Sequence, residues 1–129
     1  MANLTTIFNN HFTEFIDDVQ HVFPDDPDIL TAKHALLTVR KANPKLLVRI
    51  WLQYVYRPYQ IQIDNGDINF FINKDYSSDL AKNDNAEKII ESINRLRHPI
   101  SNMSDENQKK TMSYIQNLSK LSLLIYDSN

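Results

Sequence analysis

The stretch from Leu4 to Phe23, LTTIFNNHFTEFIDDVQHVF, decides the fold class of this chain. Its apolar side chains recur every three or four residues, a spacing that places them on one face of a helix. They are Leu4, Ile7, Phe8, Phe12, Phe15, Ile16, Val19 and Phe23. Asn3 has the side chain of an N-cap, and the prolines at 24 and 27 cannot continue a helix. The stretch therefore predicts an amphipathic helix that begins after Asn3 and ends near Phe23.

The next two segments begin with one and the same capping pattern. Asp26 before Pro27, and Asn43 before Pro44, each combine an N-cap residue with a proline in the first turn, where the missing N–H does no harm. Apolar residues with helical spacing follow each proline. In the first segment they are Ile29, Leu30, Ala32, Leu36, Leu37 and Val39, and in the second Leu46, Leu47, Ile50, Trp51, Tyr54 and Val55. Two further helices are expected.

The segment 59–72 permits two interpretations. Apolar and polar residues alternate on both sides of Asn65-Gly66, a favoured two-residue turn of a β-hairpin. A lone two-stranded hairpin is only marginally stable, however, and Gly66 is also typical of the position just after a helix, with Asp67 capping the next one. We favour two short helices and keep the small β-hairpin around Gly66 as the alternative.

The rest of the chain predicts a loop and two helices. Residues 76–85 are rich in Ser, Asp, Asn and Lys, lack periodicity, and are expected to form a mobile surface loop. A helix over 86–97 is expected to end at His98-Pro99, and Ser104 is expected to cap the last helix. The inner face of that last helix is expected to carry Tyr114, Leu118, Leu121 and Ile125. Residues 1–129 are thus predicted to form a single all-α domain, a compact bundle of about five or six helices.

Composition excludes several classes of site. The chain has no cysteine, which excludes thiolate catalysis, disulfides and zinc sites with cysteine ligands. Its one glycine, Gly66, cannot supply the glycine-rich loops that cradle nucleotide phosphates. No apolar run is long enough to span a bilayer, and no secretory signal opens the sequence. We therefore expect an intracellular protein without a membrane partner.

Four polar residues of the first helix have spacings of three and four that invite a metal-site interpretation. They are His11, Glu14, Asp18 and His21. The two histidines are about 15 Å apart along a helix axis, too far to bind one ion, so we interpret the stripe as solvated surface. The acidic residues at 25, 26 and 28 lack the spacing of a calcium loop, and no local nucleophile motif occurs. We predict no catalytic, cofactor-binding or metal-binding residue and no enzymatic activity.

Charge is segregated along this chain, whose net charge is -2. Acidic residues but no Lys or Arg occur before Lys33, and no acidic residue occurs from Ile29 to Ile63. The middle segment carries Lys33, Arg40, Lys41, Lys45, Arg49 and Arg57. Either the acidic first helix packs beside this segment and neutralises it, or the cations around the Asn43-Pro44 turn bind phosphates or an acidic protein surface. The turn lacks the glycine of a helix-turn-helix, so sequence-specific DNA readout is not expected.

Aromatic residues adjoin the basic turn. Trp51 is expected in the core, whereas the tyrosines are candidates for an interface, where one end of the ring stays wet. The candidate partner-binding residues are Arg40, Lys41, Lys45, Arg49, Tyr56, Arg57 and Tyr59. We expect a non-enzymatic interaction protein with a protein partner or self-assembly. The alternative is a nucleic-acid-associated accessory factor that binds phosphates through the basic segment 33–57. No small-molecule substrate is inferred.

Four strings of the sequence resemble a known group of proteins. They are FPDD at 23–26, RKANPK at 40–45, GDINFF at 66–71 and YIQNL at 114–118. Together they look like a family of short uncharacterised proteins of nucleocytoplasmic large DNA viruses and marine relatives. None of the strings is a functional motif, so no site residue is carried over. The resemblance implies a location in infected-cell cytoplasm or the virion, and a structural, assembly or gene-expression accessory role.

Overall fold

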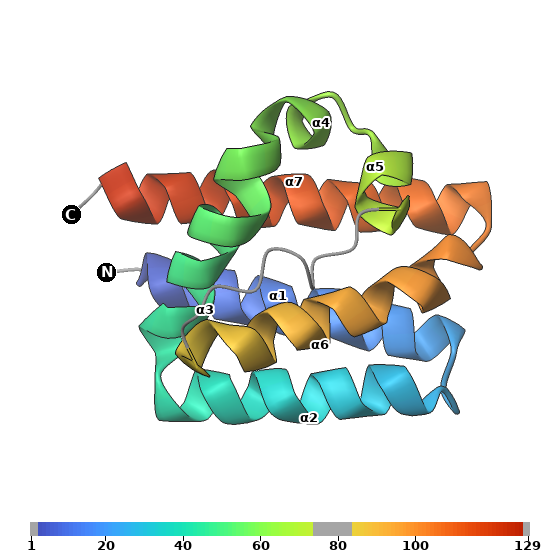
Figure 1. Ribbon diagram of the computed structural model, residues 1–129, viewed down its shortest axis with the longest axis horizontal. Helices are drawn as coiled ribbons and strands as arrows, with labels where there is room; N and C mark the ends of the chain where they lie inside the picture. Colours follow the sequence, from blue (N-terminus) through green and yellow to red (C-terminus); the bar gives the residue numbers. More distant parts are fainter. Residues whose placement is uncertain (1–2, 74–83, 128–129) are drawn as a thin grey trace.

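The computed structural model describes residues 3–73 and 84–127, and every regular element in these ranges is a helix (Figure 1). The first three helices are α1 (Leu4–Val22), α2 (Pro27–Ala42) and α3 (Pro44–Ile50). A π-helical segment (Trp51–Tyr56) and a 3₁₀ turn (Arg57–Tyr59) continue α3 into α4 (Gln60–Asp64). The remaining helices are α5 (Ile68–Asn73), α6 (Asp84–Ser101) and α7 (Asp105–Asp127). The predicted all-α bundle is confirmed.

Helix starts follow the predicted capping in α1, α2 and α7. The Asn3 side chain accepts the Thr5 N–H at 2.9 Å, and Asp26 Oδ1 accepts the Asp28 N–H at 2.8 Å. Ser104 Oγ accepts an N–H of the first turn of α7 at 3.2 Å. The expected cap of α3 is wrong, because the Asn43 side chain makes no capping bond. Proline at the first position of α3 is therefore the feature that favours its start.

Residues 60–64 and 68–73 form the short helices α4 and α5, as we favoured, and not the alternative β-hairpin. Gly66 takes a left-handed conformation (φ 71°) just after α4, and its N–H donates to the Ile63 carbonyl at 3.0 Å. Asp67 Oδ1 then accepts the Phe70 N–H at 3.1 Å and caps α5. This geometry buries Ile63 and Phe71, and Gln116 Nε2 of α7 donates to the Ile63 carbonyl at 3.0 Å. Packing of these two helices against the bundle makes them more favourable than a lone hairpin.

Both predicted boundaries of α6 are wrong. Residues 84 and 85, expected in the loop, already belong to the helix, and the rest of the expected loop, 76–83, lies outside the described residues. Pro99 was expected to end the helix but lies inside it. A proline removes one N–H, and so close to the end of a helix only the Arg95 carbonyl loses its donor. Complete burial of Ile100 in the following position offsets that loss.

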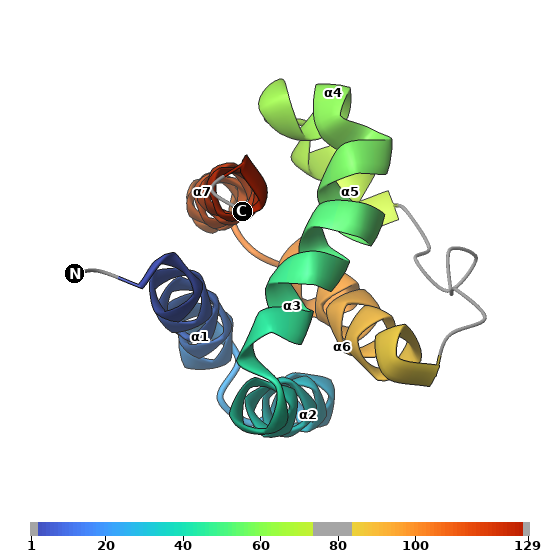
Figure 2. The same cartoon turned by 90° about the vertical axis from the view of Figure 1, so that its left-hand side faces the viewer.

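Two helix pairs and one crossing helix form the core. α1 lies antiparallel to α7, and α2 packs along α6, while α3 and its continuation cross these helices (Figures 1 and 2). Trp51, at the centre of the crossing helix, is fully buried and meets the Phe12 ring edge-to-face at a centroid distance of 5.5 Å. The π-helical segment buries four of its six side chains, those of Trp51, Leu52, Val55 and Tyr56. The prediction that Trp51 belongs to the core is confirmed.

The buried face of α7 differs from the predicted one. Its buried residues are Thr111, Met112, Ile115, Leu118, Ser119 and Ser122, whereas three of the four predicted residues are only partly buried. Trp51 Nε1 donates to Ser119 Oγ at 3.1 Å, and Ser119 Oγ donates to the Ile115 carbonyl at 2.8 Å. Ser122 Oγ donates to the Ser119 carbonyl at 2.7 Å. These bonds satisfy two buried serines, which apolar periodicity alone assigns to the surface.

Candidate interaction groove

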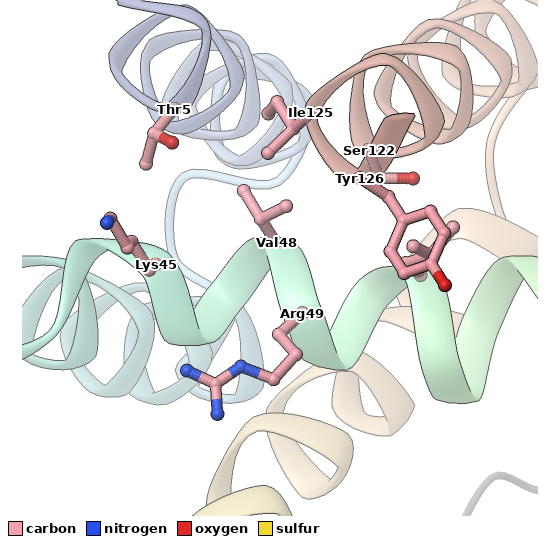
Figure 3. A pocket seen from close by; sticks show the side chains of 8 residues that line it. Thr5, Lys45, Val48, Arg49, Ser122, Ile125 and Tyr126 are labelled. Carbon is pink, nitrogen blue, oxygen red and sulfur yellow. The ribbon is translucent and has the colours of Figure 1, made fainter. Parts of the chain in front are cut away.

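A groove of about 220 Å³ lies where the start of α1, α3 with its π-helical continuation, and the end of α7 meet (Figure 3). Its lining, which we call the basic groove, consists of Thr5, Lys45, Val48, Arg49, Leu52, Ser122, Ile125 and Tyr126. Val48 and Ile125 point toward one another across its centre, while the charged ends of Lys45 and Arg49 point away from that centre (Figure 3). The groove thus has an apolar centre and a cationic edge.

The cations of this groove differ from Lys33 and Arg95, which pair with carboxylates. Lys33 pairs with Asp17 at 3.0 Å, and Arg95 pairs with Asp28 at 3.0 Å. Lys45 and Arg49 are exposed, and neither pairs with a carboxylate among the side chains that the structure describes, those of residues 3–73 and 89–127. No carboxylate lines the groove. Its positive charge is therefore free to act on a ligand.

Two other predicted basic residues, Lys41 and Arg57, lie outside the lining of the groove. Lys41 is exposed in the last turn of α2, next to the Asn43 turn that leads to Lys45. Arg57 extends the cationic edge, because its guanidinium lies 4.4 Å from the centroid of the Tyr126 ring. Such a stack holds a cation without neutralising it. Lys45 and Arg49 thus line the groove, Arg57 adjoins it through Tyr126, and Lys41 lies outside its lining.

Arg40 serves the fold instead of this surface. Its guanidinium crosses to α1 and donates to Thr13 Oγ at 2.9 Å, to the Asn9 carbonyl at 3.3 Å and to Asn10 Oδ1. These acceptors are neutral, so they do not neutralise Arg40, but its hydrogen bonds join α2 to α1. It is therefore removed from the candidate partner-binding residues.

The two predicted interface tyrosines are not open surface either. Tyr56 is only 5% exposed, and its hydroxyl donates to Asp64 Oδ1 at 3.0 Å. Burial, together with the adjacent Asp64 carboxylate, raises the pKa of Tyr56. Tyr59 is half-buried against the Phe70 ring at a centroid distance of 5.0 Å. The expectation that Tyr56 lies at an interface is wrong, because the π-helical segment turns it inward.

The polar stripe of α1 is exposed, as expected, at Glu14 and His21, whereas His11 and Asp18 are partly buried against α7. The His11 ring lies 4.9 Å from the Tyr114 ring, and Asp18 pairs with Lys110 at 3.1 Å. Burial acts to raise the pKa of Asp18, but hydrogen bonds from Tyr114 and Lys110 outweigh it and lower that pKa. Burial and the Asp18 contact raise the pKa of Tyr114 to about 12. Among the described residues, no three His, Asp or Glu side chains gather as a metal site would require.

The groove also contains residues that the sequence did not single out. Thr5 and Tyr126 are 121 positions apart and meet because α1 and α7 run antiparallel. No local motif marks either residue. The sequence offered one signal, the isolated Tyr126 near the end of an amphipathic helix. Such a tyrosine does not by itself indicate a partner surface.

Comparisons add no relative for this chain. It matches no protein-family model, no curated protein and no solved structure. The viral resemblance therefore stays a prediction. No helix in the described ranges is sufficiently long and apolar to cross a membrane.

Proposed function

We propose that this chain is a non-enzymatic interaction protein whose basic groove binds an acidic, partly apolar segment of a protein partner. The observation that supports the proposal is the pairing of an apolar centre with two exposed cations, Lys45 and Arg49, that have no carboxylate partner among the described side chains of 3–73 and 89–127. A ligand that places an apolar side chain in the centre and a carboxylate at the edge satisfies both features.

A protein segment fits the groove better than nucleic acid does. Phosphate-binding surfaces spread cations along a backbone track, whereas here the cations edge a small hollow. Overall charge is -2, which gives no general attraction to a polyanion. These features favour the protein partner over the nucleic-acid alternative.

The lining of the groove supports a binding role and no catalytic one. It carries three hydroxyl groups, on Thr5, Ser122 and Tyr126, but no histidine or carboxylate to act as a general base. Such a binding role agrees with the structural, assembly or accessory function that the viral resemblance implies. In that case the partner would be met in infected-cell cytoplasm or in the virion.

The test is fluorescence anisotropy with three labelled probes. They are an acidic peptide with interspersed valines, a peptide of equal charge with serines in their place, and a mixed-sequence DNA or RNA oligonucleotide. We expect the valine peptide to bind most tightly. We expect Lys45→Glu/Arg49→Glu to weaken it by about 100-fold, because each reversal replaces attraction by repulsion.

The matched control is Lys109→Glu, which reverses an exposed cation outside the groove. It should leave peptide binding within about twofold of the wild type, as expected of a distant surface charge. Tighter binding of the oligonucleotide, with affinity falling steeply as salt rises, would contradict the proposal and support the nucleic-acid alternative. Equal binding of both peptides would contradict the role given to the apolar centre.

A further inference from the structure

Free acidic groups lie at the end of the bundle opposite to the basic groove. The α1–α2 and α6–α7 turns share that end, whereas the α2–α3 turn and the end of α7 lie at the other (Figure 1). Asp25 in the first turn, and Asp105 and Glu106 at the start of α7, are exposed and form no ion pair in the described chain. Carboxylates along the middle are engaged, as Asp17 is with Lys33. Unpaired carboxylates of the described chain thus lie at the end opposite to the unpaired cations of the groove.

The two ends are too far apart to neutralise one another within one molecule. α1, of 19 residues, joins them and is about 28 Å long at 1.5 Å per residue. At physiological ionic strength the Debye length is about 8 Å, so exposed charges this far apart are screened from each other. The interpretation in which the acidic helix neutralises the basic segment holds for Lys33 but not for the groove. Each end remains available to another molecule.

The acidic turn has the composition that the basic groove requires of a ligand. Val22 is 36% exposed and is followed by half-buried Phe23 and then by exposed Asp25. An apolar side chain and a free carboxylate thus stand three residues apart on one tight turn. That turn is held in shape, because the Asp26 N–H donates to the Phe23 carbonyl at 3.2 Å. In Figure 1 this turn lies at the end of the bundle opposite to the α2–α3 turn.

We propose that the basic groove binds the Val22–Asp26 turn of a second copy of this chain, so that copies associate head to tail. This inference rests on the proposed function and names the partner of the same groove. In the contact, Val22 enters the space between Val48 and Ile125, and Asp25 meets Lys45 or Arg49. Two different surfaces meet, so the association is heterologous and continues into an open chain or closes into a ring.

Each end also carries opposing charge, and one such residue at each end provides a control. Lys109 is exposed one turn after Glu106, and Asp127 is exposed at the end of α7 beside Tyr126. Reversing either of them changes the net charge by two, as Asp25→Lys does, but makes its own end more strongly charged. Neither reversal should therefore weaken the association.

Sedimentation velocity of the purified chain tests the proposal. We expect the average sedimentation coefficient to rise with protein concentration at low salt and to fall toward that of a monomer as salt increases. Asp25→Lys and Lys45→Glu/Arg49→Glu should each weaken the association, by about 10-fold and 100-fold, whereas Asp127→Lys and Lys109→Glu should not. A monomer at every concentration at low salt would overturn the proposal.

Mixing the two charge-reversed variants gives the sharper test. Asp25→Lys gives the turn the same sign as the groove, and Lys45→Glu/Arg49→Glu gives the groove the same sign as the turn, so neither should associate with itself. A head-to-tail contact predicts that an equimolar mixture associates, because the positive turn of one variant fits the negative groove of the other. Restored association also shows that both variants are folded. Two folded variants, with circular dichroism like that of the wild type, that fail to associate in the mixture would overturn the proposal.

The acidic valine peptide separates failure of this inference from failure of the proposed function. If the chain stays monomeric but binds that peptide in the groove, the groove has another partner and only self-association is overturned. If neither the peptide nor a second copy binds, both proposals fail.

Discussion

The hydrogen bond between Trp51 Nε1 and Ser119 Oγ should couple the crossing helix to α7 energetically. Both side chains are buried, and the indole N–H of Trp51 donates to Ser119 Oγ at 3.1 Å. Ser119→Ala leaves that donor unsatisfied, which costs about 1–3 kcal/mol, while the better helix propensity of alanine returns a few tenths, about 0.5 kcal/mol at most. We therefore expect the free energy of unfolding to fall by about 1–2 kcal/mol. Because Ser122 lines the groove one turn later, the same junction holds the groove in shape.

A double-mutant cycle measures this coupling. Trp51→Phe removes the donor and some buried volume, so Ser119→Ala should cost little in that background. Urea unfolding followed by far-ultraviolet circular dichroism is the assay, since Trp51 is the only tryptophan and its fluorescence is lost in the variant. Ser113→Ala, an exposed serine of the same helix, serves as control and should change stability by less than about 0.5 kcal/mol. Losses that add within about 0.5 kcal/mol would refute the reasoning.

Three further predictions concern single residues. Gly66→Ala should destabilise by about 1 kcal/mol in urea unfolding, because alanine is strained at a φ of 71°, and an unchanged midpoint would contradict the left-handed turn. Asp26→Ala should cost about 1 kcal/mol through loss of the α2 cap, whereas Asp25→Ala, which caps nothing, should leave the unfolding midpoint unchanged. Tyr114 should ionise near pH 12, because its folded pKa is raised to about 12 from 10.0. The stability that this raised pKa contributes is fully present below pH 10 and is lost as pH rises toward 12. Tyr114→Phe should therefore reduce the loss of stability at alkaline pH. In a titration followed by tyrosinate absorbance, the variant should lack the ionisation step at the highest pH.

Most of the fold was predictable because its signals are local. Asn3, Asp26 and Ser104 cap helices through side chains that stand two or three residues from the N–H groups they accept. Apolar spacing marked the buried faces of α1 and α2 for the same reason. Gly66 was the ambiguous position, since a glycine with positive φ serves a hairpin turn and a helix end equally well. Only packing against α7 decides between the two.

The errors arose where tertiary contacts outweigh local preference. Pro99 lies inside α6 because burial of Ile100 offsets one lost hydrogen bond. Ser119 and Ser122 are buried in α7 because Trp51 and backbone carbonyls satisfy their hydroxyls. These partners are 3 to 68 residues away in the sequence, and no periodicity reveals the longest of the contacts.

The candidate site was predictable in its cations but not in its shape. Charge segregation pointed to Lys45 and Arg49, which line the groove, but also to Arg40, which donates to acceptors on α1 instead. The apolar centre and the Tyr126 edge depend on the antiparallel arrangement of α1 and α7. That arrangement is a property of the whole bundle and has no signature in any one segment.

The most direct test of the basic groove is a titration of the ¹⁵N-labelled protein with the acidic valine peptide, followed by amide chemical shifts. We predict that the shifts concentrate on Thr5, Lys45, Arg49 and Tyr126 and vanish in Lys45→Glu/Arg49→Glu. Shifts confined to other surfaces, or equal shifts in the wild type and in that variant, would contradict the assignment of this groove as the binding site.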